Sequence, residues 1–294
     1  MYNSDTDDQI DSNPEETITV LKIFSVFCCL SIIFQSIIVV LYIKLVDLRT
    51  LRGFSARLIL YMAFTDIVVW AISFQSNMLK LSNGKTMFAY CIALCRFEGI
   101  VWNTFLLSNF LLTVVFSLSI LIEIKYDILL GKYEKWILPG IFIYSIFFSI
   151  VPIFYKLDTY GEDDHFKCWI TDPYTDFRII GFYAHLWIAF LTNLSIVGYI
   201  VWLIRDVHFT HNTLIKKLIW IPLIMLFCWA EPSIRRIKSD DNQFELKLIQ
   251  YICTPMQGFL NAFVYGLIND TVKRYILKCF KNEIEEERVQ PNLL

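Results

Sequence analysis

Seven long apolar segments, separated by short stretches that hold nearly all of the charged residues, constrain this chain more than any other feature. A bilayer with a hydrocarbon core of about 30 Å requires roughly 20 apolar residues per helix, and the helix must satisfy its own backbone hydrogen bonds. We place the segments at residues 18–43, 56–79, 91–122, 134–155, 178–204, 217–237 and 245–267. The pattern predicts an all-α membrane protein, folded as a bundle of seven transmembrane helices.

Composition excludes an ordinary soluble domain. Apolar residues make up 56% of the 294 residues and charged residues only 18%, whereas soluble domains carry about 25% charged residues. Seven helices use most of the chain. We therefore expect one membrane domain at 18–267, an acidic tail at 1–17 and a short tail at 268–294.

The charges between the segments predict the orientation. Residues 1–17 contain no Lys or Arg, the reverse of a signal peptide, so we expect the first helix to be retained. With the N-terminus outside, basic residues outnumber acidic ones in the inner loops and tail, while acidic residues are in excess outside. The positive-inside rule then predicts an extracellular N-terminus and a cytoplasmic C-terminus.

The eight cysteines differ in depth. Four lie inside apolar segments, where packing is their ordinary role: Cys28, Cys29, Cys228 and Cys253. Cys95 begins the third helix at its outer end and Cys168 lies in an outer loop, so both face an oxidising compartment. We expect a disulfide between Cys95 and Cys168, with Cys91, one helical turn away, as the alternative partner. Cys279, beside two lysines just past the last helix, is a candidate for lipidation.

The last apolar segment carries the most specific motif, QGFLNAFVYG at residues 257–266. This motif resembles the signature of the slime-mould cyclic AMP receptor-like family of G-protein-coupled receptors, a group (class E) close to the adhesion and secretin classes. Other stretches resemble the family in the same order: Leu51, Arg52, Phe54, Leu58, Tyr61 and Asp66; Cys95 and Gly99; Lys132 to Lys135; Cys168 to Ile170; Phe182, Tyr183, Leu186 and Trp187; and Cys228 and Trp229 with Ile234 to Ile237. The rhodopsin-like DRY and NPxxY motifs are absent from the sequence.

The resemblance implies a cell-surface receptor of the plasma membrane. Its expected partners are membrane lipids, a heterotrimeric G protein and an extracellular small-molecule ligand, of which a cyclic nucleotide is one candidate. No cofactor, metal or nucleic acid is expected. The tail at 268–294 is expected to form a cytoplasmic amphipathic helix that ends in an acidic run.

The middle of the bundle offers candidates for an activation switch. Asp66 lies within an apolar helix, where an ionisable group normally faces the bundle interior and has a partner. Asn261 is the candidate partner, and Tyr265 and Trp229 are further members of the switch. Because Pro222 and Pro232 kink the sixth helix, we expect that helix to move.

Charged residues at the two ends of the helices are candidates for binding. Those near the outer mouth could contact a ligand, and arginines suit a phosphate: Arg96, Glu98, Lys167, Arg178, Glu231, Arg235 and Arg236. A basic inner rim could contact a G protein, although topology and lipid headgroups also account for it: Arg49, Arg52, Lys132, Lys135, Lys216 and Lys217.

Other functions are less consistent with the sequence. A retinal protein requires a lysine in the middle of the seventh helix, and Lys247 lies at its edge. An enzyme is not expected, because the sequence contains no clustered metal ligands and no H-E-x-x-H or G-x-S-x-G motif. A small transporter, or a membrane protein without G-protein coupling, stays open as the alternative, although the two halves show no internal repeat.

Overall fold

The computed structural model describes residues 14–45, 54–84, 91–128, 130–162, 168–171, 174–204, 212–238 and 244–268. Residues 1–13 of the predicted acidic tail, residues 269–294 with Cys279, and the loop residues Arg49 and Arg52 lie outside these ranges. The last residues of the predicted acidic tail, 14–17, instead form the first turn of the first helix.

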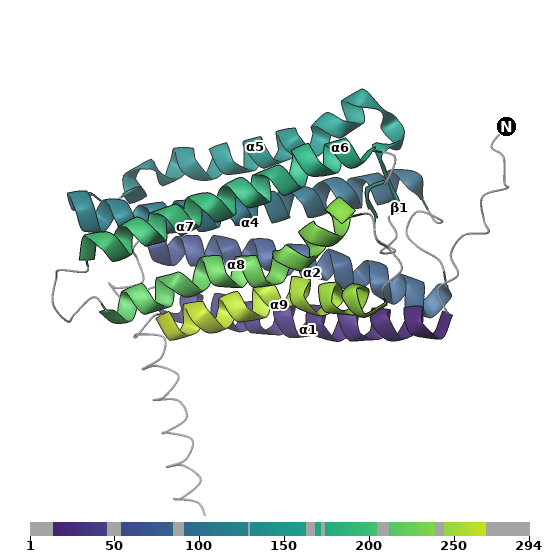
Figure 1. Cartoon of the computed structure of the whole chain (residues 1–294), viewed down its shortest axis with the longest axis horizontal. Helices are drawn as coiled ribbons and strands as arrows, with labels where there is room; N and C mark the ends of the chain where they lie inside the picture. Colours follow the sequence, from purple (N-terminus) through teal and green to yellow (C-terminus); the bar gives the residue numbers. More distant parts are fainter. Residues whose placement is uncertain are drawn as a thin grey trace, which may run out of the picture.

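Long helices form almost all of the described structure (Figure 1). They are α1 (Pro14–Leu45), α2 (Phe54–Asn83), α4 (Ile92–Tyr126), α5 (Glu134–Tyr155), α7 (Ala184–Ile204), α8 (Asn212–Lys238) and α9 (Phe244–Ile268). These helices coincide with the seven apolar segments and several extend beyond them. They run on because a helix continues to satisfy its backbone hydrogen bonds after the side chains turn polar.

Five of the helices in the described part of the chain are long and apolar enough to cross a membrane. These spans are Ile18–Lys44, Phe54–Asn83, Ile92–Tyr126, Leu130–Tyr155 and Asp176–Leu203. In α8 the side chains are described for Trp220–Ile234, and this part forms a shorter apolar helix.

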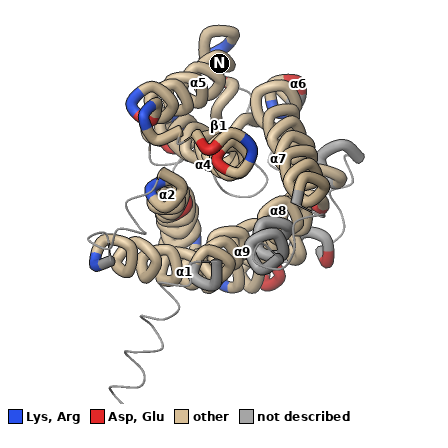
Figure 2. Tube along the Cα trace, turned by 90° about the vertical axis from the view of Figure 1, so that its left-hand side faces the viewer, with Lys and Arg blue, Asp and Glu red and all other residues tan. Residues whose placement is uncertain are grey.

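The helices pack as a closed ring with one helix outside it. In order, α1 contacts α2, α2 contacts α4, α4 contacts α7, α7 contacts α8, and α8 contacts α9, which returns to α1. α5 packs on the outside against α4. Figure 2, viewed along the bundle, shows α4 surrounded by its neighbours, with charged residues near the helix ends. Of the apolar stretch of α4, 61% is buried, against 22% for α5, so α4 is the central column.

The outward faces keep large apolar side chains exposed. On α5, Ile143 is 67% exposed, Phe147 60% and Phe154 85%. Contiguous apolar surface of this kind is typical of a face that meets lipid or another apolar partner.

Short elements between the long helices were absent from our prediction. β1 (Tyr160–Glu162) and β2 (Cys168–Ile170) form an antiparallel hairpin that packs on α4. A helical turn, α6 (Thr175–Arg178), continues through a π-helical turn at Ile179–Tyr183 into α7. Short 3₁₀ turns at Leu130–Tyr133 and Leu157–Thr159 flank α5. Strands of three residues give no periodic signal, which is why the sequence showed only a loop there.

Candidate functional site

The hairpin is attached to the start of α4 at one end of the bundle. A disulfide joins Cys168 of β2 to Cys95 of α4, while Cys91, the alternative partner, is a free and exposed cysteine. All three residues of β2 are buried. The disulfide therefore holds a buried strand, and with it Trp169, over the helices.

Gly99 permits the close approach of α4 to this hairpin. A Cβ at Gly99 would lie 2.6 Å from the ring of Tyr160 and 2.9 Å from the carbonyl oxygen of Cys168. Tyr160 donates a hydrogen bond of 2.8 Å to the carbonyl oxygen of Ser149 in α5. Burial raises the pKa of the Tyr160 phenol, so the hydroxyl stays a neutral donor. A side chain at Gly99, one of the residues that resemble the family, would thus prevent α4 from packing against the hairpin.

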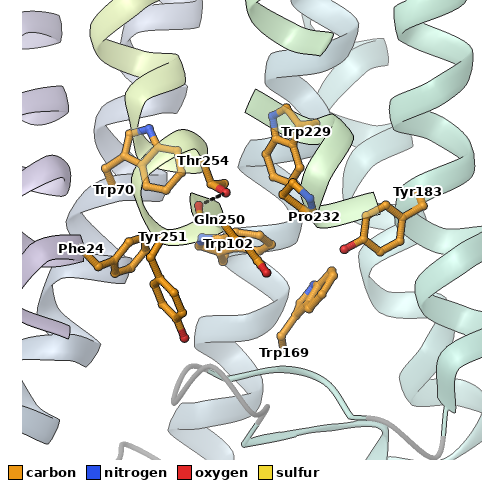
Figure 3. Close-up of a pocket in the computed structure, with 10 residues that line it drawn as sticks. All are labelled: Phe24, Trp70, Trp102, Trp169, Tyr183, Trp229, Pro232, Gln250, Tyr251 and Thr254. Atoms are coloured by element: carbon orange, nitrogen blue, oxygen red, sulfur yellow. Dashed lines mark hydrogen bonds between the residues drawn. The ribbon is translucent and has the colours of Figure 1, made fainter. Parts of the chain in front are cut away.

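Next to the hairpin lies a cavity of about 470 Å³, part of which is open to solvent. Side chains from α1, α2, α4, β2, the π-helical turn, α8 and α9 surround it, and most of them are aromatic (Figure 3). The lining consists of Phe24, Trp70, Trp102, Trp169, Tyr183, Trp229, Pro232, Gln250, Tyr251 and Thr254. Mostly apolar walls with a few polar groups are typical of sites that bind small organic ligands.

Three of the charged ligand candidates interact elsewhere in the structure. Arg178 is buried, donates a hydrogen bond of 2.6 Å to the carbonyl oxygen of Ile170, and lies over the Trp169 ring. Arg96 pairs with Asp158 at 2.8 Å. Glu98 accepts a hydrogen bond from Ser76. None of these three side chains lines the cavity.

The other four ligand candidates are less defined. Glu231 is half-buried on α8 and does not line the cavity. Lys167 lies outside the described residues. Arg235 and Arg236 belong to α8, but their side chains are outside the described part of the structure. The arginines expected to hold a phosphate are thus not part of the described cavity wall.

Trp229 connects α8 to its neighbours inside the bundle. Its indole nitrogen donates a hydrogen bond of 2.5 Å to the side-chain oxygen of Gln257 on α9. Its ring meets Phe110 of α4 edge to face and Phe182 at an angle, both with centroids 5.4 Å apart. Phe182 in turn lies 5.3 Å from Trp169 of the hairpin. A continuous aromatic path thus runs from the hairpin to α8.

Asp66 belongs to a buried cluster of polar side chains. Gln35 of α1 donates a hydrogen bond of 2.8 Å to one carboxyl oxygen, and Asn109 of α4 donates one of 3.1 Å to the other. Asn261 of α9, the expected partner, also hydrogen-bonds the carboxyl. We call Gln35, Asp66, Asn109 and Asn261 the polar core.

The polar core ties four helices together. Gln35 donates a second hydrogen bond, of 2.7 Å, to the carbonyl oxygen of Gly258, and Asn109 also donates to Thr65 at 2.9 Å. Tyr265, another switch candidate, is fully buried, with its hydroxyl 3.3 Å from the Met62 sulfur. α1, α2, α4 and α9 therefore meet through amide and carboxyl groups in the middle of the bundle.

Gln35 and Asn109 were not among our candidates. Gln35 is the single amide of α1, and Asn109 is one of two in α4, with Asn103; such isolated polar residues carry no periodic signal. The rule that placed Asp66 inside the bundle applies to amides as well, so their position within apolar segments is the signal that could have revealed them.

At the opposite end of the bundle, an ion pair joins α2 to α5. The Arg57 guanidinium donates to the Glu134 carboxylate, with Nε 2.8 Å from Oε2, and the Tyr61 hydroxyl donates to the same carboxylate at 3.2 Å. Tyr61 and Glu134 stand in the stretches that resemble the family, yet we had assigned them no role. This network ties the start of α5, directly after the turn at Leu130–Tyr133, to α2.

The basic rim is described only in part. Lys132 and Lys135 are exposed, and each lies over a neighbouring ring, Tyr133 at 4.9 Å and Trp136 at 5.7 Å. Lys216 and Lys217 belong to α8, but their side chains are not described. Among the described residues, no group of three or more His, Cys, Asp or Glu side chains could hold a metal ion.

No family model matches the chain. The sequence is similar to the cyclic AMP receptor-like protein A of Dictyostelium discoideum, with 27% identity over 250 residues. The alignment covers 79% of this chain and 62% of the relative, so the chain spans less than two thirds of that protein's length. The similarity extends over most of the bundle and supports a relationship to cyclic AMP receptor-like proteins.

Proposed function

We propose that this chain is a seven-transmembrane receptor of the cyclic AMP receptor-like type that transmits an extracellular ligand signal to a heterotrimeric G protein. Its N-terminus lies outside and its C-terminus in the cytoplasm, at the plasma membrane. The closed ring of helices, the similarity to a receptor-like protein and the basic inner rim support this assignment. All seven long helices then span the bilayer, α8 and α9 with their charged ends at the interfaces.

The aromatic path from Trp169 through Phe182 to Trp229 is the observation that carries the proposal. It begins on a hairpin that a disulfide holds over the outer end and ends on α8. A ligand in the cavity touches both ends of the path, since Trp169 and Trp229 both line the cavity. Ligand binding is thereby coupled to the position of α8.

α8 is the helix best suited to move. It contains Pro222 and Pro232, and proline removes a backbone hydrogen bond and kinks a helix. A ligand that binds the state with α8 displaced outward more tightly than the closed state shifts the equilibrium toward that state and opens a cytoplasmic cleft. The size of this shift is set by the difference between the ligand's affinities for the two states. A G protein then binds at the inner rim, at Lys132, Lys135, Lys216 and Lys217.

Cyclic AMP is the first ligand to test, because the similar protein carries that name. Its phosphate would need Arg235, Arg236 or Lys167, whose side chains lie outside the described part of the structure.

Guanine-nucleotide exchange on a co-reconstituted heterotrimeric G protein tests the proposal. We expect the purified protein to catalyse exchange, and the double variant Lys216→Glu, Lys217→Glu to lose most of it. Lys22→Glu, a charge reversal at an exposed position near the outer end of α1, serves as the matched control and keeps the exchange rate. If a panel of G proteins, each tested with and without cyclic AMP, shows no exchange above the double variant, the receptor proposal is wrong, and solute uptake becomes the assay to run.

A further inference from the structure

We infer that the cavity beside the hairpin binds an uncharged, planar aromatic molecule with one or two hydrogen-bonding groups, rather than a phosphate-bearing nucleotide. This inference concerns the ligand and rests on the proposed function, because the cavity is taken as the receptor's ligand site. It goes against the cyclic nucleotide that the resemblance suggests.

The charge of the cavity wall is the first step. None of the described residues that line the cavity carries a formal charge. Two charged candidates near the cavity are engaged elsewhere: Arg178 with the Ile170 carbonyl oxygen and the Trp169 ring, and Arg96 with Asp158. Glu231, next to Pro232 on α8, does not line the cavity. An ion that enters the cavity loses its hydration and gains no counter-charge from the described wall, which is strongly unfavourable.

The aromatic rings are the second step. Figure 3 shows Phe24, Tyr251 and Trp70 on one side of the cavity and Trp229, Trp169 and Tyr183 on the other. The negative potential over ring faces disfavours an anion further, while offset and edge-to-face contacts favour another planar ring. Ring faces also attract cations, but a cation would find no carboxylate in the described wall.

The rings hold one another in place. Phe24 meets Tyr251 edge to face at 5.0 Å, and Trp102 meets Trp169 in the same way at 5.6 Å. The Trp102 indole also donates a hydrogen bond of 3.0 Å to Ser73. Because these side chains are already ordered, they lose little conformational entropy when a ligand binds. Little of the favourable free energy of stacking against the ligand is therefore offset.

The polar side chains of the wall explain the requirement for hydrogen-bonding groups. Thr254 donates its hydroxyl hydrogen to the Gln250 backbone oxygen at 2.7 Å, which leaves lone pairs of the Thr254 oxygen to accept from a ligand. Figure 3 shows this bond among the side chains that line the cavity. A ligand donor such as a hydroxyl or ring N–H fits here.

Three molecules with one indole ring and different charges test the inference: indole-3-ethanol is neutral, indole-3-acetate is an anion and tryptamine is a cation. The readout is displacement of the fluorescent probe 1-aminoanthracene from the full-length purified protein in detergent. Since none of the described lining residues is charged, indole-3-ethanol should displace the probe at roughly tenfold or more lower concentration than either ion. Equal or tighter binding of indole-3-acetate, tryptamine or cyclic AMP would overturn the inference.

Two variants place the probe in this cavity. Thr254→Phe fills the space and should abolish displaceable probe binding, whereas Phe263→Ala, on the exposed face of the same helix, should leave it unchanged. Gln250→Arg supplies a positive charge and should shift the preference toward indole-3-acetate by roughly tenfold. Probe binding that survives in Thr254→Phe, or no shift in a Gln250→Arg protein that still binds the probe, contradicts the inference.

This experiment contains no G protein, so its failure differs from a failure of the receptor proposal. Nucleotide exchange without binding of the neutral indole refutes the ligand class alone. Binding of the neutral indole without exchange refutes the receptor function and leaves the ligand site in place.

Discussion

The aromatic cavity and the polar core are built by largely the same helices, yet they are opposite in character. Trp70 lines the cavity, and Asp66, one turn away on α2, is hydrogen-bonded from α1, α4 and α9. Two neighbours on α9 belong to different regions: Gln257 accepts the hydrogen bond from Trp229 of the aromatic path, and the Gly258 carbonyl oxygen accepts one from Gln35 of the polar core. In the cavity the rings leave a space that is partly open to solvent, whereas amide and carboxyl groups close the space around Asp66.

The contrast has a physical consequence. Lipid is as apolar as the helix surfaces, so packing and interhelical hydrogen bonds hold helices together in a bilayer. The polar core provides such bonds at one depth, which leaves the neighbouring layer free to be hollow. We expect changes in the core to cost stability and changes in the cavity to alter binding.

Removing the central carboxyl should have the largest effect on stability. Asp66→Leu removes the carboxyl acceptor that Gln35 and Asn109 share and leaves them only their other acceptors, such as Gly258 and Thr65, so we expect a loss of about 2–3 kcal/mol in the free energy of unfolding. Denaturant unfolding in mixed micelles measures it. Asp66→Asn keeps an acceptor oxygen and should lose less than half as much. An Asp66→Leu protein as stable as the wild type would show that the core does not hold the helices.

A methyl group at Gly258 should have the next largest effect. Its Cβ would collide with Ser31 Oγ and lie 3.0 Å from the Trp70 indole nitrogen, so we expect Gly258→Ala to cost about 1–3 kcal/mol. Gly198→Ala on α7 is the matched control, because nothing lies within 4 Å of its added Cβ. The double variant Ser31→Ala, Gly258→Ala should recover part of the loss in the same unfolding assay, and no recovery would contradict the proposed collision.

The link between the two regions can be weakened by a smaller change. Trp229→Phe keeps a ring against Phe110 and Phe182 but removes the donor to Gln257, which we expect to cost about 1 kcal/mol. A Trp229→Phe, Gln257→Leu double variant removes both hydrogen-bonding partners and should be no less stable than Trp229→Phe. If it is clearly less stable, Gln257 contributes through packing rather than through this bond.

The smallest effect should come from the ion pair at the other end of the bundle. Arg57 and Glu134 have side chains 35% and 18% exposed, so solvent screens them, and we expect a coupling energy of only about 0.5–1 kcal/mol. A double-mutant cycle with Arg57→Gln and Glu134→Gln measures it. If the coupling energy of this pair is as large as the loss of unfolding free energy in Asp66→Leu, a partly exposed ion pair stabilises the protein as much as the buried polar core, and the expected order of effects is wrong.

Sequence reasoning located one half of the polar core and missed the other. Asp66 and Asn261 stood out because an acid in an apolar helix needs a partner. Gln35 and Asn109 are uncharged, so they did not stand out in the sequence. Only the packing of α1 and α4 against α2 brings them to the Asp66 carboxyl.

The charged candidates at the outer mouth show a different limit. Residue type suggested that Arg178 could hold a phosphate, but the side chain is buried against the Ile170 carbonyl oxygen and the Trp169 ring. The rings that do line the cavity come from seven separate elements, and each alone resembles ordinary packing. Chemistry read from residue type cannot tell which groups face a common space.

The positions of the long helices follow from the amino-acid order alone, because an apolar segment of bilayer length has to close its backbone hydrogen bonds within itself. The positions of Cys95 and Cys168 away from the middle of the apolar segments also follow from the sequence, which is why it could predict a disulfide between them. Folding in three dimensions decided that Cys95 rather than Cys91 meets Cys168, that a hairpin covers a cavity lined with rings, and that four helices share one carboxyl. These are contacts between residues far apart in the chain, and only the packing of helix faces sets them.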